Sequence, residues 1–175
     1  MRKTIIAAWT ERWAAMYSAE AKEIRRIFGN NVLHTYHIGS TSVPHIGYAK
    51  PIIDLLVVVR DINLVDSHTD EMTQLGYAPR GESGIKGRRY FTKGGYNRTH
   101  HVHTYAAGNV NIKMHLDFKE YLLTHPEEAK KYGELKVSLA KKFPDDTYKY
   151  QEGKESFVSE LMASATEWAS KRPNN

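Results

Sequence analysis

The sequence contains no cysteine, and it contains no run of about 18 apolar residues. Without cysteine the chain cannot form disulfide bonds, catalyse through a thiol, or bind a metal through thiolates. Without a long apolar run we expect no membrane span, and charged residues interrupt the first apolar stretch, between Trp9 and Phe28. No signal segment is therefore expected at the start of the chain. These absences predict a cytoplasmic protein with no membrane partner.

The length of 175 residues favours one domain over residues 1–175, and 41% of the residues are hydrophobic and available for a core. The formal net charge of +5 is a mild excess, which suits an anionic ligand without requiring nucleic acid. No strand is rich in aromatic residues as in RNA-binding modules, so nucleic acid is not an expected partner.

The positive charge is concentrated in one segment, residues 80–103. This segment contains a single carboxylate, Glu82. Its six cationic residues are Arg80, Lys86, Arg88, Arg89, Lys93 and Arg98. The segment is either part of an anion site or a solvated basic loop.

Apolar periodicity divides the chain into a sheet-containing part and a helical part. Residues 8–28 repeat at helical spacing, residues 32–38 alternate as in a strand, and residues 51–59 form an apolar run typical of an inner strand. We expect a helix over 63–75 and strands over 89–92 and 101–105. Further helices are predicted over 114–123, 126–142 and 150–170. The predicted fold class is α/β (α+β): a small mixed sheet flanked by helices up to about residue 110, then a helical part over about 111–172.

A Gly-Ser turn lies between the first two predicted strands, in the stretch HIGSTSVPHIGYAKPIIDLLVVV of residues 37–59. Gly39 and Ser40 allow close approach of the backbone to a ligand, and their N–H groups can form an anion-binding nest. Lys50 precedes the second strand, and Asp54 lies within it. An ionised carboxylate in an apolar strand costs free energy unless a cation, hydrogen bonds or a cleft compensates it. Asp54 is therefore either a site residue or a structural partner of a cation such as Lys50.

His101 and His103 are two residues apart in a predicted strand, so both side chains point to the same face. Either they bind a phosphate or substrate through hydrogen bonds, or they hold a metal ion together with Asp54. Imidazole and carboxylate ligands suit Zn²⁺, Mn²⁺ or Fe²⁺ better than Mg²⁺. Asp117 is either a helix-cap residue or a more distant carboxylate of the same site.

The stretch of residues 37–59 and three later blocks together resemble the signature of the GrpB family, which belongs to the nucleotidyltransferase-fold superfamily. The later blocks are HHVHTY, LDFKEYLLTHPEEAKKYGELKVSLA and YQEGKESFVSELMASATEW, in the order of the family. The resemblance implies a Gly-Ser turn that holds phosphate oxygens and paired carboxylates that bind Mg²⁺ for in-line attack. Gly39 and Ser40 match the turn, and Asp54 matches one carboxylate. The partner positions, Ile52 and Leu56, are apolar, so the carboxylate pair is incomplete.

The resemblance implies a protein that binds a nucleotide or a phosphorylated small molecule and transfers a nucleotidyl group. The alternative is a binding module that has kept the pocket and lost the chemistry. We assign catalysis to Asp54 and Lys50, and binding of a divalent metal, Mg²⁺ or Mn²⁺, to Asp54, His101 and His103. Substrate binding is assigned to the turn and to cationic residues in the matching blocks and the basic segment: Gly39, Ser40, Thr41, Ser42, Arg89, Lys136 and Lys154. The alternative for Lys136 and Lys154, which both lie on predicted helices, is that they are ordinary solvated side chains.

Overall fold

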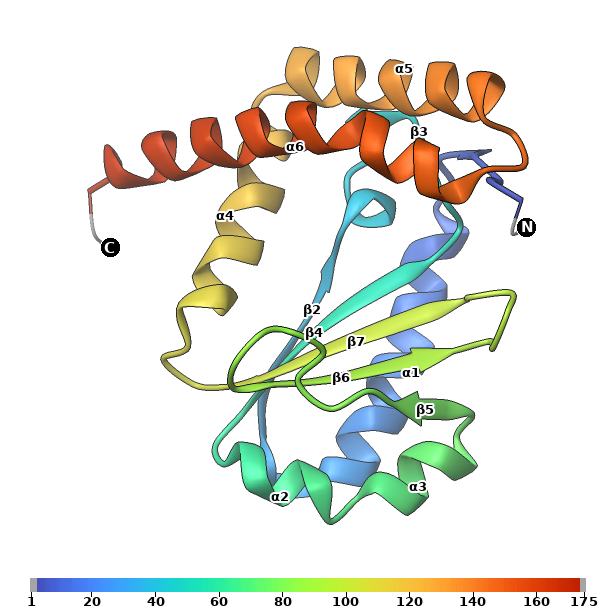
Figure 1. Ribbon diagram of the computed structural model, residues 1–175. Helices are drawn as coiled ribbons and strands as arrows, with labels where there is room; N and C mark the ends of the chain where they lie inside the picture. The colour runs from blue at the N-terminus through green and yellow to red at the C-terminus, as the bar shows by residue number, and fades with distance from the viewer. Residues whose placement is uncertain (1–2, 174–175) are drawn as a thin grey trace.

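The computed structural model describes residues 3–173 and has a mixed α/β fold (Figure 1). The central sheet has five strands in the spatial order β2 (Val32–Ile38), β4 (Ile53–Val59), β7 (His100–Ala106), β6 (Arg88–Lys93) and β5 (Tyr77–Pro79). β4 runs parallel to β7, and the other neighbouring pairs are antiparallel. β1 (Ala7–Ala8) and β3 (Tyr48–Ala49) form a separate pair. β4 is thus the inner strand that its apolar run predicted.

The helices lie on several sides of this sheet. They are α1 (Arg12–Phe28), α2 (Ile62–Asp66), α3 (Thr69–Gln74), α4 (Val110–Thr124), α5 (Pro126–Lys142) and α6 (Thr147–Ser170). α1 covers the rear of the sheet, α2 and α3 lie below it, and α5 and α6 cross above it as a helical layer that α4 joins to β7 (Figure 1). Three 3₁₀ turns are η1 (Gly29–Asn31), η2 (Ser40–Ser42) and η3 (Pro44–Ile46). Within residues 3–173, no helix has both the length and the apolarity needed to cross a membrane.

The two faces of β4 belong to different clusters because side chains alternate along a strand. Ile53, Leu55 and Val57 are fully buried in the core that includes α1. Leu56 points the other way and packs in a cluster with Ile38 and with residues of β7 and α4. Asp54 shares this second face, at the beginning of the strand. This position brings its carboxylate toward the helical layer instead of the main core.

Several helix boundaries differ from the sequence prediction. α1 begins at Arg12 instead of residue 8, because Ala7 and Ala8 pair with β3. The helix predicted over residues 63–75 is two short helices, α2 and α3. Ser67 Oγ donates to the Leu64 carbonyl and Thr69 Oγ1 to the Asp66 carbonyl, and such local bonds compete with a continuous helix. The short edge strand β5 was not predicted.

Candidate functional site

The turn after β2 brings the backbone directly against Asp54. Gly39 has φ +71°, in the left-handed region that favours glycine. A Cβ atom at Gly39 would lie 2.6 Å from Asp54 Oδ2, so the turn or the Asp54 side chain would have to shift. Ser42 Oγ donates a hydrogen bond of 2.7 Å to the Gly39 carbonyl and holds the turn. The group that the Gly39 backbone approaches in the structure is therefore the Asp54 carboxylate.

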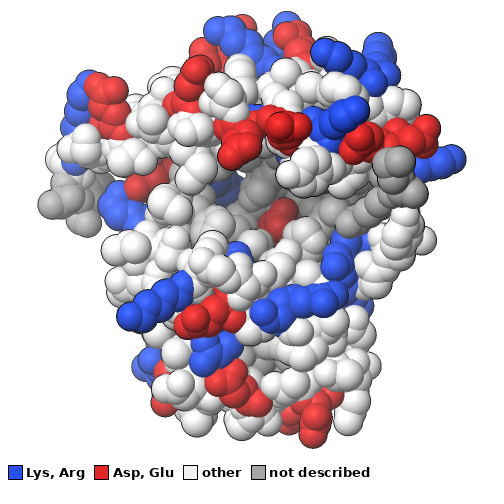
Figure 2. Space-filling view, in the orientation of Figure 1, with Lys and Arg blue, Asp and Glu red and all other residues white. Residues whose placement is uncertain are grey.

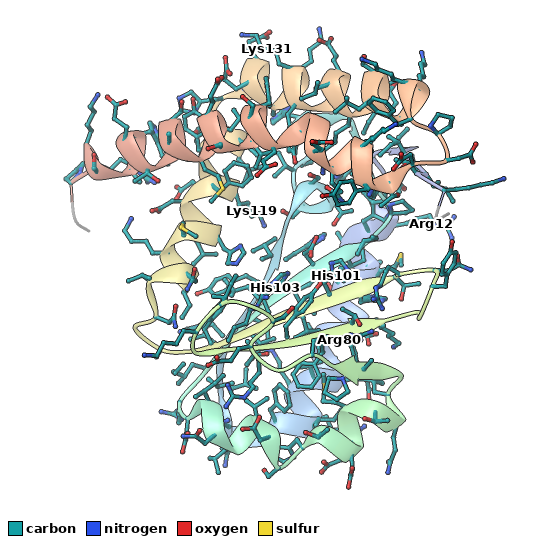
Figure 3. The ribbon with its side chains drawn as sticks, in the orientation of Figure 1. Arg12, Arg80, His101, His103, Lys119 and Lys131 are labelled. Carbon is teal, nitrogen blue, oxygen red and sulfur yellow. The ribbon has the colours of Figure 1, made fainter. Side chains whose placement is uncertain are left out.

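Asp54 meets His101 and His103 because β4 and β7 are paired in parallel. Asp54 lies opposite His101 in the register, and Leu56 lies opposite His103, so the three polar side chains share one face. His101 Nδ1 and His103 Nε2 each lie 3.2 Å from Asp54 Oδ1. The Tyr90 ring of β6 packs against both imidazoles, with centroid distances of 5.6 and 5.1 Å. Figure 3 shows the two histidines side by side on the sheet.

Asp54, His101 and His103 form a group that could hold a single divalent cation. Atoms of Asp54, His101 and His103 lie within 4.8 Å of one another. Ligand atoms around a Zn²⁺-sized ion lie about 3.0–3.4 Å apart. The two carboxylate–imidazole distances of 3.2 Å match that spacing, while the set as a whole extends over up to 4.8 Å. A second carboxylate beside Asp54 is missing, because Leu56 is fully buried among apolar side chains and Ile52 is also apolar.

The Asp54 carboxylate is held in its ionised form. Burial disfavours the charge, but hydrogen bonds from His101 and His103 outweigh burial and keep the pKa of Asp54 below its usual range. Two nearby histidines, in contrast, are held in their neutral form. Burial lowers the pKa of His37 to about 4, and it lowers the pKa of His115 to about 4. The Asp54 anion therefore lies near two imidazoles, those of His37 and His115, whose lowered pKa keeps them neutral at neutral pH.

Three lysines from separate segments converge above Asp54. Lys50 precedes β4, Lys136 lies on α5, and Lys154 lies on α6. The Lys136 Nζ is 4.2 Å from the centre of the Tyr132 ring. Lys50 Nζ and Lys154 Nζ are 4.5 and 4.8 Å from the centre of the Tyr150 ring. Each ammonium group is thus held over an aromatic face, an attractive electrostatic arrangement.

Burial lowers the pKa of two of these lysines. Lys136 is 3% exposed, and its ammonium group donates a hydrogen bond to Ser40 Oγ. Burial and repulsion from Lys154 lower the pKa of Lys136 well below its ordinary value, although Asp54 opposes the shift. Burial lowers the pKa of Lys154 to about 8, again with Asp54 opposing. A bound anion would favour the protonated form of both lysines.

These groups line a cleft of about 310 Å³ between the sheet and the helical layer. Figure 2 shows the hollow between these two parts. The cleft lining contains three lysines and one carboxylate, so its charge suits an anion. The predicted site residues that the structure brings together in this lining are Gly39, Ser40, Thr41, Lys50, Asp54, His101, Lys136 and Lys154. His103 joins them through its hydrogen bond to Asp54.

Arg89, which the sequence assigned to substrate binding, does not line the cleft. Its guanidinium makes two hydrogen bonds to the Asp66 carboxylate of α2, at 2.6 and 3.0 Å. Arg89 points to the face of β6 opposite Tyr90, because neighbouring side chains in a strand point to opposite faces. The basic segment 80–103 is therefore divided between the two faces of the sheet.

Other predicted residues have local structural roles. Thr41 is 1% exposed, and its Oγ1 is hydrogen-bonded to His37 Nε2 at 2.9 Å. Ser42 holds the Gly39 turn through the bond described above and lies outside the cleft lining. Asp117 lies within α4, where it pairs with Lys113 on the preceding turn. The sequence alternative of a second active-site carboxylate at Asp117 has no support from this geometry.

The sequence prediction missed the tyrosines beneath the lysines. Tyr132 and Tyr150 line the cleft, and the Tyr150 side chain is fully buried. A sequence signal was present, because Tyr132–Lys136 and Tyr150–Lys154 repeat a Tyr-x-x-x-Lys pattern on two helices. Residues four apart on a helix are neighbours on its surface. The repeated pattern thus marks the two helix faces that turn toward the cleft.

A comparison with protein-family models identifies the chain. The model described as GrpB protein matches residues 3–164. The chain belongs to the GrpB family. The UPF0157 protein YqkA of Bacillus subtilis is 44% identical over 173 residues, which cover 99% of this chain and 50% of YqkA. A UPF0157 protein of Pseudomonas aeruginosa is 34% identical over 87% of this chain and 64% of its own length. The GrpB chain thus spans half of the first relative and less than two thirds of the second.

Solved structures share the fold. The crystal structure of conserved protein GrpB from Enterococcus faecalis matches with a TM-score of 0.90 and 40% identity, over 95% of this chain and 100% of that chain. The structure of Cid1 in complex with its short product ApU matches with a TM-score of 0.50 and 11% identity, over 77% of this chain and 42% of that chain. The Cid1 match supports a nucleotidyltransferase-like fold for this GrpB protein.

Proposed function

We propose that the cleft of this GrpB protein binds the phosphate groups of a nucleotide and a divalent cation, and that it transfers the nucleotidyl group to an acceptor. The observation that carries the proposal is the meeting of Lys50, Lys136 and Lys154 with Asp54 in one cleft. Lysines bind phosphate oxygens, and a carboxylate beside two imidazoles is a set of ligands suited to a divalent cation. Ser40, bonded to Lys136, lies beside the same phosphate position.

Different residues of the cleft would bind the phosphates and the cation. Lys136, Lys154 and Ser40 would orient the phosphates, and Asp54, His101 and His103 would hold the divalent cation, Mg²⁺ or Mn²⁺. When bound, such a cation neutralises phosphate charge and polarises the phosphoryl group. An acceptor oxygen forms a bond to the α-phosphorus, the bond to the bridging oxygen breaks, and pyrophosphate leaves with that electron pair. The proton of the acceptor passes to solvent, and Lys50 stabilises the charge that develops on the leaving group.

Binding without transfer is the second candidate function, and the incomplete set of carboxylates favours it. Asp54 is the single carboxylate of the metal group in the described chain, since the neighbouring positions on its face are apolar. Two-metal transfer depends on carboxylates that hold both ions. On this reading the cleft binds the nucleotide or another phosphorylated small molecule and releases it unchanged.

Calorimetry with Mn²⁺ and α,β-methylene-ATP tests the proposed binding. We expect one analogue per chain, and an affinity at least about tenfold lower for Asp54→Asn, which removes the metal-binding charge. Asp66→Asn is the matched control, because Asp66 pairs with Arg89 on the other face of the sheet. Lys154→Gln should weaken binding similarly, and Lys149→Gln, an exposed lysine of the same helix, should not. A wild-type protein that binds no analogue with any metal would refute the proposal.

A second measurement separates transfer from binding alone. The protein is incubated with α-labelled ATP, Mn²⁺ and a small-molecule extract that supplies acceptors. Labelled product and pyrophosphate in equal amounts, both lost in Asp54→Asn, would support transfer. Tight analogue binding without any product would favour the binding module.

A further inference from the structure

A second cavity of about 620 Å³ adjoins the cleft, at the end of the sheet where β4 and β7 begin. Its lining comes from the N-terminal segment, from the residues before β4 and from the β6–β7 turn, which lie at the same end of the sheet (Figure 1). Lys50 and Ile52 line both cavities. Because Ile52 is two residues before Asp54, the cavities meet next to the proposed metal ligand.

The charge of this second cavity is entirely positive. Lys3, Lys50 and Arg98 line it, and its lining includes no carboxylate. Arg98 Nη1 donates to Thr92 Oγ1 at 2.9 Å, and no carboxylate of residues 3–173 pairs with its guanidinium. A cavity with several cations and no acid attracts an anion.

The cavity also has an apolar side. Ile5 is 63% exposed and Tyr96 is 67% exposed, although they are large apolar side chains. They lie about 90 residues apart in the chain and line the same cavity together with Pro51. Exposed apolar side chains gathered in a concave surface are typical of a ligand site. The expected ligand therefore has an apolar or aromatic body and an anionic group.

The walls of the cavity are fixed by hydrogen bonds and by tight backbone packing. The Thr4 N–H donates to the Pro144 carbonyl at 2.9 Å, and the Thr4 and Thr147 hydroxyls are 3.0 Å apart. In the β6–β7 turn, a Cβ atom at Gly94 would lie 2.3 Å from the Asn97 carbonyl oxygen. These contacts hold the N-terminal segment and the turn in place. The cavity is thus largely preformed, as ligand sites usually are.

We propose that this cavity is the acceptor subsite of the protein, and that the acceptor is a small anionic molecule with an aromatic or apolar ring. The inference rests on the proposed function, because the cleft must hold the nucleotide. The ring lies against Tyr96, Ile5 and Pro51, and the anion pairs with Arg98 and Lys3. Lys50 stands between the two subsites, so the reactive end of the acceptor lies beside Asp54.

The test uses phenyl phosphate, a small aromatic anion, titrated into protein already saturated with Mn²⁺ and α,β-methylene-ATP. We expect it to bind the wild type and to lose at least about fivefold in affinity in Arg98→Gln and in Tyr96→Ala. Lys86→Gln and Tyr48→Ala are matched controls, because both residues are exposed and neither lines a cavity described above; they should change the affinity less than about twofold. The affinity for the nucleotide analogue should stay unchanged in all four variants.

Several results would overturn the acceptor subsite without affecting the cleft. They are the absence of phenyl phosphate binding, binding insensitive to Arg98→Gln and Tyr96→Ala, or displacement of the nucleotide by phenyl phosphate. A single-stranded RNA oligonucleotide that binds far more tightly through the same two residues would overturn the small-molecule assignment. If the analogue itself fails to bind, the proposed function fails, and phenyl phosphate titrated into the unliganded protein still reports on the cavity.

Discussion

At the scale of single residues, the lowered pKa of Lys154 makes the cleft sensitive to pH near 8. Its pKa of about 8 means that the free protein loses this cation as the pH rises through 8. A phosphate group binds the protonated form, so binding draws a proton onto Lys154 above that pH. Lys50, Lys136 and Asp54 are the other charged groups of the cleft lining.

We therefore predict that the affinity for α,β-methylene-ATP falls from about pH 7.5 to about pH 9, by severalfold. In Lys154→Arg the side chain stays charged throughout this range, so the decline should be smaller. Calorimetry in buffers of different ionisation enthalpy should also show proton uptake by the wild type. Superimposable pH profiles for the wild type and Lys154→Arg would contradict the role of Lys154.

The contact between the turn at Gly39 and the Asp54 carboxylate can be tested by substitution of Gly39. The positive φ should cost Gly39→Ala and Gly47→Ala about 1–2 kcal/mol of stability each, and Gly39→Ala should lose more because its Cβ also meets Asp54. Only the Cβ at Gly39 meets Asp54, whereas the position at Gly47 has nothing within 4 Å. We predict that Gly39→Ala alone also loses Mn²⁺ affinity, measured by electron paramagnetic resonance. Equal Mn²⁺ affinity in the two variants would show that the turn does not position Asp54.

At the scale of elements, the placement of α5 decides where Lys136 lies. A Cβ atom at Gly133 would be 1.7 Å from the carbonyl oxygen of Ile46 in η3. Lys136, three residues further along the helix, is 3% exposed and bonded to Ser40. The close contact between α5 and η3 thus fixes the depth of the lysine in the cleft.

Gly133→Ala should lower stability by about 1–3 kcal/mol, although alanine has the better helix propensity. The displaced α5 should also weaken binding of the nucleotide analogue. Gly153→Ala on α6 is the control, because its Cβ would meet only the end of the flexible Leu139 side chain, at 2.6 Å. Chemical denaturation and calorimetry measure both effects. Similar losses in the two variants would argue against the α5–η3 contact as the element that positions Lys136.

At the scale of the whole molecule, the sheet part and the helical layer share a hydrophobic cluster. Val43 and Ile46, which follow the Gly-Ser turn, are buried with Leu122, Tyr132 and other residues of the helical layer. The cleft lies between the two parts, so a bound nucleotide would contact both. We propose on this basis that residues 1–175 behave as one domain.

The expected result is a single unfolding transition for the whole chain. In Trp168→Phe, fluorescence reports on Trp9 and Trp13 near the sheet, while circular dichroism is dominated by the helices. Both signals should give the same midpoint, because the shared cluster makes the two parts cooperative. Two separated midpoints would show that the helical layer unfolds independently.

The sequence by itself determined the elements of this protein and part of its site. The apolar run at 51–59 predicted the inner strand because such strands are buried on both faces. A side-chain period of two placed His101 and His103 on one face, and the free-energy cost of a carboxylate in that strand singled out Asp54. The four sequence blocks identified the family. Each of these conclusions depends on local spacing or composition, which a sequence contains directly.

Only the tertiary structure decided which charged side chains face the cleft. Arg89 and Tyr90 are neighbours in sequence, yet Arg89 pairs with Asp66 while Tyr90 packs on the histidines. The sequence indicated that Arg89 and Tyr90 point to opposite faces of a strand. Which of these faces lies toward the cleft depends on the register between β6 and β7. Lys136 and Lys154 come from helices whose rotation about their axes is set by packing against η3 and each other. Contacts between residues distant in the chain fix register and rotation, so local patterns could not have determined them.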